Sequence, residues 1–303
     1  MSEHTLSPLR RKHLKVGEIS TFWKIMIYLL LAALAVVFIV PFLLVISISF
    51  SADDSIKLNG YKLIPTKFTL DGYRYIFNNG KLVYYAYRNS IITAGLGTVL
   101  NVLMCLLVAY PLAREEFKWR KSVSFFVFFT MMFGGGLVPY YILVKQYLHL
   151  NDSLWVLILP ALVSPGNVFL LRIFIQSLPK EIYESARMDG ANEYTILFKI
   201  TAPLVKAGIA TVSLFIVLGY WNDVFTPRLF ITEPELYTLP LLLDRYTVVL
   251  NQTIGTTLPG MMAPPKDAMM FAMCVVSTGP MLFVFMFFQK YFVKGMVLGS
   301  VKG

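Results

Sequence analysis

The sequence predicts an all-α membrane protein that crosses the bilayer six times. Of its 303 residues, 57% are hydrophobic and only 15% are charged, whereas a soluble globular protein carries about 25% charged residues. Six apolar runs each approach the roughly 20 residues that a helix needs to cross about 30 Å of hydrocarbon. The runs are continuously apolar, which favours helices over the alternating pattern of a membrane barrel.

The six predicted spans follow one another along the whole chain. In order, they cover residues 25–48, 90–113, 122–144, 154–178, 200–220 and 268–288. Pro41 is expected to kink the first span, and a run of three glycines, 134–136, lies inside the third. The fourth span is interrupted at 164–167. We interpret that interruption as a proline kink in one helix, with a discontinuous helix at a binding site as the alternative.

The basic residues predict how the chain is oriented. The short loop 114–121 carries Arg114, Lys118, Arg120 and Lys121, whereas the short turn 145–152 carries only Lys145. Since Lys and Arg concentrate in cytoplasmic loops, the first of these loops is placed inside, together with both termini. The chain is therefore predicted to consist of a cytoplasmic N-terminal segment (1–24), a six-span domain (25–290) and a cytoplasmic tail (291–303).

Two long loops are then expected on the outer side, at 49–89 and 221–267. Loops of this length in a compact protein are often functional. Their content of tyrosine and proline favours ordered caps over the bundle.

The inner loop at 179–199 predicts a helical hairpin on the membrane surface. Pro179 suits a first helical turn, and Glu181 and Glu184 complement the positive end of the helix dipole. Gly190 is free to end that helix in the left-handed conformation, and a second helix is expected from Asn192. Small side chains on the first helix would let a partner approach closely. From these residues alone, an ordinary amphipathic surface loop is an equal alternative.

This loop resembles the EAA loop of ABC-importer permeases. That pattern is Glu-Ala-Ala, three residues, Gly, nine residues and a closing Ile-x-Leu-Pro. Here Glu184-Ser185-Ala186 is followed by Gly190, and the closing stretch runs from Ile200 to Pro203. Ser185 replaces the middle alanine, and Ala202 replaces the leucine.

Other stretches extend the resemblance over nearly the whole chain after about residue 20. They are Asn89-Ser90, Ala109-Tyr110-Pro111-Leu112-Ala113-Arg114, Gly135-Gly136-Leu137-Val138-Pro139, Trp221-Asn222-Asp223 and the tail from Gln289 to Gly303. Together they are similar to the maltose-type permeases of carbohydrate uptake family 1, and to the branch that imports polysaccharide-derived oligosaccharides.

The resemblance implies a type I ABC-importer permease bundle in the bacterial inner membrane. It implies a second, homologous permease as a heterodimer partner, two cytoplasmic ATPase subunits, an extracytoplasmic sugar-binding protein and an oligosaccharide substrate. This chain would hold no cofactor, because ATP and Mg²⁺ would lie on the ATPase. The residues expected to couple to the ATPase are Glu181, Glu184, Ser185, Ala186, Asp189, Gly190 and Ala191.

Other functions find little support in the sequence. There is no GxxxxGK[ST] phosphate loop, so we expect no ATP hydrolysis and no enzymatic activity in this chain. The histidines and cysteines show no metal-binding spacing. The charges lie between apolar runs, which argues against a nucleic-acid partner. Glu115 and Glu116 are interpreted as a solvated charge run, and Arg172 as a side chain that reaches the inner surface.

Two transport alternatives stay open. One is an ABC permease for another small polar solute, and the other is a secondary transporter, although the span centres carry essentially no ionisable residues. Aromatic and polar residues near the predicted pathway are the candidates for contact with the solute: Tyr140, Tyr141, Asn167, Trp221, Asn222 and Asp223.

Overall fold

The computed structural model describes residues 21–78, 80–252 and 266–300, and within them the chain is built from helices. Most of the predicted N-terminal segment, part of the second outer loop and the end of the tail lie outside the described residues.

Four of the described helical segments are long and apolar enough to cross a membrane. They are α1 (Thr21–Ser49), α4 (Gly80–Ala113), α12 (Lys206–Asn222) with α13 (Phe225–Phe230), and α15 (Lys266–Ser300). Two bent helix pairs bring the number to six if each pair is one span. The six predicted apolar segments are thus all found, and two of them are broken.

The third predicted span breaks at its glycines. It consists of α5 (Arg120–Met132) followed by α6 (Leu137–Ile142) and the π-helical η1 (Leu143–Tyr147), at 106° to one another. Gly136 adopts a φ of +87°, a conformation that glycine reaches without steric cost. The expectation of one continuous helix over 122–144 is therefore wrong.

The fourth predicted span is also interrupted, and the proline-kink interpretation is wrong. The short helices α7 (Trp155–Ile158) and η2 (Leu159–Ala161) meet α8 (Pro165–Gln176) at 52°. Pro165 occupies the first turn of α8, where its missing N–H costs nothing, and Ser164 before it is extended. Here the proline starts a new helix instead of bending an old one.

Neighbouring side chains satisfy the backbone that this break exposes. Asn101 of α4 donates from its amide to the carbonyl of Ala161. The thiol of Cys105, one turn later on α4, lies 3.7 Å from the carbonyl of Ser164. Since unpaired carbonyls are costly at membrane depth, these two contacts allow the interruption to exist.

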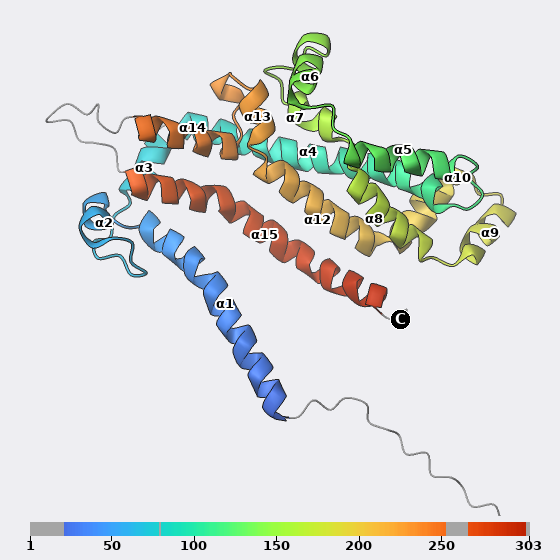
Figure 1. The fold of residues 1–303 in the computed structure, drawn as a ribbon, viewed down its shortest axis with the longest axis horizontal. Coiled ribbons are helices and arrows are strands. Elements are labelled where there is room, and N and C mark those ends of the chain that lie inside the picture. The colour runs from blue at the N-terminus through green and yellow to red at the C-terminus, as the bar shows by residue number, and fades with distance from the viewer. Residues whose placement is uncertain (1–20, 79, 253–265, 301–303) are drawn as a thin grey trace, which may run out of the picture.

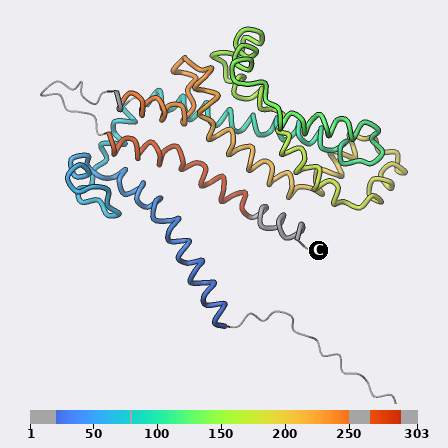
Figure 2. The backbone as a smooth tube through the Cα atoms, viewed as in Figure 1, coloured from blue at the N-terminus to red at the C-terminus, as the bar shows by residue number. Residues whose placement is uncertain are grey.

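The core lies where α4, α8 and α12 pack together, and α15 lies along α12 (Figure 1). Leu171, Ile175 and Val212 are among its fully buried side chains. The helix α1 begins away from α15 and approaches it toward its C-terminal end, as the backbone trace shows (Figure 2). Over its apolar window α1 is 0% buried.

The predicted loops lie at opposite ends of the bundle (Figure 1). One end holds α2 (Asp53–Asn59), α3 (Asp71–Asn78) and α14 (Leu239–Gln252), all of which come from the two predicted outer loops. The other end holds α9 (Lys180–Met188) and α10 (Glu193–Thr195) from the predicted inner loop. The described parts of the outer loops contain these helices together with non-helical stretches such as residues 60–70.

Two span boundaries differ from the prediction. The helix α4 begins at Gly80, inside the predicted first outer loop, and α15 continues past the predicted end at residue 288 to Ser300. The helix α1 runs through Pro41 without a break, so the kink expected there stays a prediction.

Candidate functional site

The first arm of the predicted hairpin is α9, and a glycine turn ends this helix. Gly190 has a φ of +78°. Its N–H donates to the carbonyl of Arg187, and the next N–H, of Ala191, donates to the carbonyl of Ala186, both over 3.0 Å. This pair of bonds is the Schellman motif, which satisfies the last carbonyls of a helix. The left-handed glycine predicted at this position is confirmed.

The second arm of the hairpin begins where it was predicted, and Asn192 caps it. The side-chain oxygen of Asn192 accepts from the N–H of Thr195 over 2.8 Å. The chain then continues through α10, η3 (Ile196–Thr201) and α11 (Ala202–Leu204) into α12. The hairpin is therefore joined without a flexible linker to a helix of the bundle.

Arg114 fastens the hairpin to the end of α4. Its guanidinium carbon lies 3.8 Å from the ring centroid of Tyr183 on α9 and 5.8 Å from that of Tyr110 on α4. Arg114 is only 7% exposed, and its Nε also donates to Glu116 over 3.3 Å. Burial raises the pKa of the Tyr183 hydroxyl. A desolvated cation against an aromatic face holds more strongly than one in water.

A carboxylate makes the second attachment. Glu193 of α10 accepts from the hydroxyl of Tyr110 over 2.5 Å and from Arg187 of α9 over 2.8 Å. Partial burial of Glu193 acts to raise its pKa, but the Tyr110 and Arg187 hydrogen bonds outweigh it, so the pKa lies below its usual value. Both arms of the hairpin are thus tied to α4.

The two acidic residues of the loop after α4 are paired. Glu115 forms an ion pair with Lys180, and this bond holds the pKa of Glu115 below its usual value. Glu116 pairs with Arg114 and lies 3.7 Å from Arg187. The interpretation of Glu115 and Glu116 as solvated charges holds, since their side chains are 63% and 56% exposed, and the ion pairs add that both also join the hairpin to this loop.

The outward face of the hairpin is a shallow groove of about 450 Å³. It is lined by Glu181, Ile182, Ser185, Ala186, Asp189 and Ile200. Four of the seven predicted coupling residues thus share one surface. Glu184, Gly190 and Ala191 lie on the same hairpin outside the groove, with Glu184 exposed.

Two large side chains of the hairpin were not among the predicted residues. Met188 is 89% exposed and Tyr194 is 72% exposed. Large apolar side chains that are exposed to solvent often mark a surface that a partner covers. In the sequence, the only indication that Met188 and Tyr194 are exposed is that polar residues surround them.

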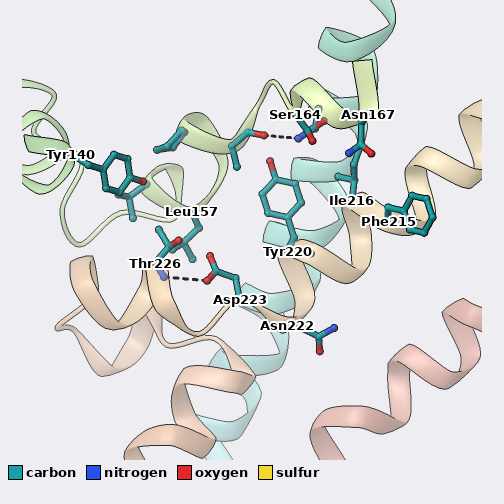
Figure 3. A pocket seen from close by; sticks show the side chains of 15 residues that line it. Tyr140, Leu157, Ser164, Asn167, Phe215, Ile216, Tyr220, Asn222, Asp223 and Thr226 are labelled. Carbon is teal, nitrogen blue, oxygen red and sulfur yellow. Dashed lines mark hydrogen bonds between the residues drawn. The ribbon is translucent and has the colours of Figure 1, made fainter. Parts of the chain in front are cut away.

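The second candidate region is a cavity of about 480 Å³ beside the break in the fourth span (Figure 3). Its lining comes from α4, α6, α12, α13, the break itself and the segment between α12 and α13. In Figure 3 the ring of Tyr220 and the carboxylate of Asp223 lie between the break and α13. Irregular backbone at membrane depth is tolerated where it lines such a cavity.

Four of the six predicted pathway residues line this cavity: Tyr140, Asn167, Asn222 and Asp223. The other two lie elsewhere. Trp221 is buried in the core and donates from its indole N–H to the carbonyl of Ser277 over 3.0 Å. Tyr141 stacks on Phe230, with ring centroids 5.4 Å apart.

Sequence reasoning missed further polar side chains of the cavity, which are Asn101, Ser164, Tyr220 and Thr226. Asn101 lies in the middle of an apolar run, and that position was the available signal for it. Asp223 is the one charged residue among the described lining residues, and its carboxylate accepts from the N–H of Thr226 over 3.1 Å. No group of described residues is suited to hold a metal ion.

Comparison with known proteins places these features in a family. Residues 87–298 match the family described as "Binding-protein-dependent transport system inner membrane component". The matched region contains the hairpin, the cavity and both broken spans.

Similar proteins cover almost the whole chain. It is 38% identical over 280 residues to the polygalacturonan/rhamnogalacturonan transport system permease protein YtcP of Bacillus subtilis, covering 92% of this chain and 97% of that one. It is 32% identical to the arabinooligosaccharides transport system permease protein AraQ of the same organism, covering 79% of this chain and 81% of that one. A crystal structure of a bacterial ABC transporter involved in the import of the acidic polysaccharide alginate superimposes with a TM-score of 0.79 at 26% identity, over 94% of this chain and 100% of that one.

Proposed function

Because this chain belongs to the family of binding-protein-dependent transport system inner membrane components, we propose that it carries an oligosaccharide into the cytoplasm as one half of a pore. It is the membrane permease subunit of an ABC importer and not an enzyme. Such a permease works with a separate ATPase and a binding protein. The secondary-transporter alternative is thereby set aside.

The hairpin is the observation that supports coupling most directly. It stands at the end of the bundle opposite the outer loops, and it is held to α4 through Arg114 and Glu193. In this proposal the ATPase grips the groove around Ser185 and Ala186, and Glu184 pairs with a basic group of the ATPase. Coupling requires that the partner bind two arrangements of the same element with different affinity. Because the hairpin is joined to α4 and α12 without a flexible linker, a movement of the hairpin would also move these two helices.

The orientation follows from the same proposal. The hairpin and both termini lie in the cytoplasm, where ATP and Mg²⁺ are bound by two ATPase subunits. The loops that carry α2, α3 and α14 then face the binding protein on the outside. Figure 1 supports this arrangement, because α1 begins and α15 ends away from the end that holds those loops.

A second, homologous permease completes the pore. The support comes from α1, which is apolar on all sides and unburied over its span. A helix that is hydrophobic all round is suited to lipid or to another apolar surface. We propose that the partner permease packs beside α1 and α15.

The cavity supports a sugar as the solute. Amides, tyrosine hydroxyls and a carboxylate hydrogen-bond to sugar hydroxyls, and aromatic rings pack against sugar faces. The cavity offers these groups in Asn101, Asn167, Tyr140, Tyr220 and Asp223. The relatives named above transport polygalacturonan or rhamnogalacturonan, arabinooligosaccharides and alginate, so all of their named solutes are built from sugar units.

The proposal is tested with the double variant Glu184→Lys and Gly190→Asp. We expect it to reach the membrane in normal amounts, to lose sugar uptake and to release the ATPase on purification. Asp54→Lys is the matched control for membrane insertion and ATPase retention, because Asp54 is an exposed acid on α2 at the other end of the molecule. Wild-type uptake and ATPase retention in the double variant would remove the docking proposal.

A further inference from the structure

A second concave surface at the hairpin end of the bundle is strongly basic. It has a volume of about 760 Å³ and lies where the start of α5 meets α8. Four of its lining residues are cations: Lys118, Arg120, Lys121 and Arg172. The others are Glu115, Phe117 and Ser124.

Among the described residues, the side chains around the hollow do not compensate this positive charge. Glu115, the one acid of the lining, is already paired with Lys180. The first turn of α5 contains no acidic residue. Arg172 donates to the hydroxyl of Ser124 over 3.1 Å, which is a neutral partner. Four like charges around one hollow repel one another, and a bound anion would relieve that repulsion.

The surroundings of the hollow are those of a membrane surface. Trp119, between Lys118 and Arg120, is 68% exposed, and tryptophan is enriched at the level of lipid headgroups. One turn beyond Lys121 begins an exposed apolar face of α5, on which Phe125 and Phe129 lie four residues apart. A cationic hollow therefore continues directly into a face suited to an acyl chain.

From this juxtaposition we infer that the hollow binds the phosphate headgroup of an anionic phospholipid, whose acyl chain lies along the exposed phenylalanines of α5. Basic pockets between membrane helices on the cytoplasmic side are suited to such headgroups. A free phosphate ion would use the same cations but would leave the phenylalanine face unused. This inference does not depend on which solute the importer moves.

The test uses the assembled importer, reconstituted in bilayers of equimolar phosphatidylglycerol and phosphatidylcholine, and then extracted in mild detergent. Native mass spectrometry counts the lipids that stay bound. The wild type is expected to retain phosphatidylglycerol in preference to phosphatidylcholine. Arg120→Gln with Arg172→Gln should lower this preference on the order of tenfold, since each removed cation weakens the attraction.

Two further double variants distinguish a loss of the site from misfolding and from a general loss of positive charge. Lys118→Gln with Lys121→Gln removes two exposed cations of the same hollow and should also reduce the preference. Lys24→Gln with Lys206→Gln removes two exposed cations outside it and should leave the preference intact.

Three results would overturn the inference. The first is equal retention of both lipids by the wild type. The second is an unchanged preference in both hollow variants, which would place the preference for the anionic lipid elsewhere on the importer. The third is displacement of the bound lipid by excess inorganic phosphate alone, which would identify a site for a soluble anion.

Discussion

The guanidinium of Arg114, at the end of α4, lies over the ring of Tyr183 on the hairpin, with 3.8 Å between its central carbon and the ring centroid. Arg114 is buried, so separating its guanidinium from the ring of Tyr183 would change the surroundings of both side chains. The contact joins the surface that we assign to the ATPase with a helix that spans the membrane.

Replacing Tyr183 with leucine removes the aromatic face and should weaken the attachment by about 1–2 kcal/mol. We expect sugar uptake to fall while membrane insertion and ATPase binding persist, because the groove itself is untouched. Tyr183→Phe keeps the ring and is the matched control. Uptake and ATP hydrolysis should be measured together, since a loosened hairpin lowers uptake per ATP. Equal coupling in the leucine and phenylalanine variants would contradict the role of the ring.

The attachment through Glu193 should depend on pH. Its pKa in the folded protein lies below the free value of about 4.3. The ionised form is therefore favoured by the fold, and its contribution is complete above the free pKa and is lost as the pH falls through the folded pKa. A spin label at Met188→Cys should become more mobile over that acidic range.

Glu193→Gln should raise the mobility of that label already at neutral pH and reduce its acid response. A residual response is expected, because Glu115 and Glu116 also have lowered pKa values at this surface. A label at Asp54→Cys, at the opposite end, is the control. The same acid response at both labels would mean general unfolding and not release of the hairpin.

The packing of α8 against α12 depends on a glycine. A Cβ atom added at Gly208 would lie 2.4 Å from the ring of Phe174. Gly208→Ala should therefore destabilise the protein by about 1–3 kcal/mol through overpacking. Gly95→Ala on α4, where no atom lies within 4 Å, is the control. Thermal unfolding in detergent compares the two, and an equal midpoint for both variants would contradict this packing.

The break in the fourth span should depend on Asn101. Asn101→Leu leaves the carbonyl of Ala161 unpaired, at a cost of about 1–3 kcal/mol. We expect a lower unfolding temperature and reduced uptake, because this carbonyl belongs to the cavity wall. Cys105→Ser retains a donor near Ser164 and should remain close to the wild type. Full stability of the leucine variant would show that the break holds without this bond.

The apolar pattern predicted the number and order of the membrane segments, because run length is a direct measure of span length. It could not predict that two segments are broken. The glycines at 134–136 and Pro165 are compatible with a kink or with a break, and the choice depends on partners such as Asn101, which lies far away in the sequence.

The hairpin was predicted well because its signals are local. The turn at Gly190 and the cap at Asn192 need only their neighbours in the chain. Its attachment to α4 was missed, since a pair such as Tyr110 and Glu193 is separated by 83 positions. Trp221 was wrongly predicted to line the pathway because its partner, Ser277, is also distant in the sequence; Trp221 is buried and donates to the carbonyl of Ser277.

The most direct test places a cysteine at Ser185 in the groove of the hairpin. In the assembled importer, Ser185→Cys should cross-link to the ATPase subunit, and an impermeant thiol reagent added outside intact cells should not label it. The parent chain is the control, because Cys105 is buried and Cys274 is half-buried. Labelling from the outside, or the absence of any cross-link to the ATPase, would contradict the assignment of this hairpin as the coupling element.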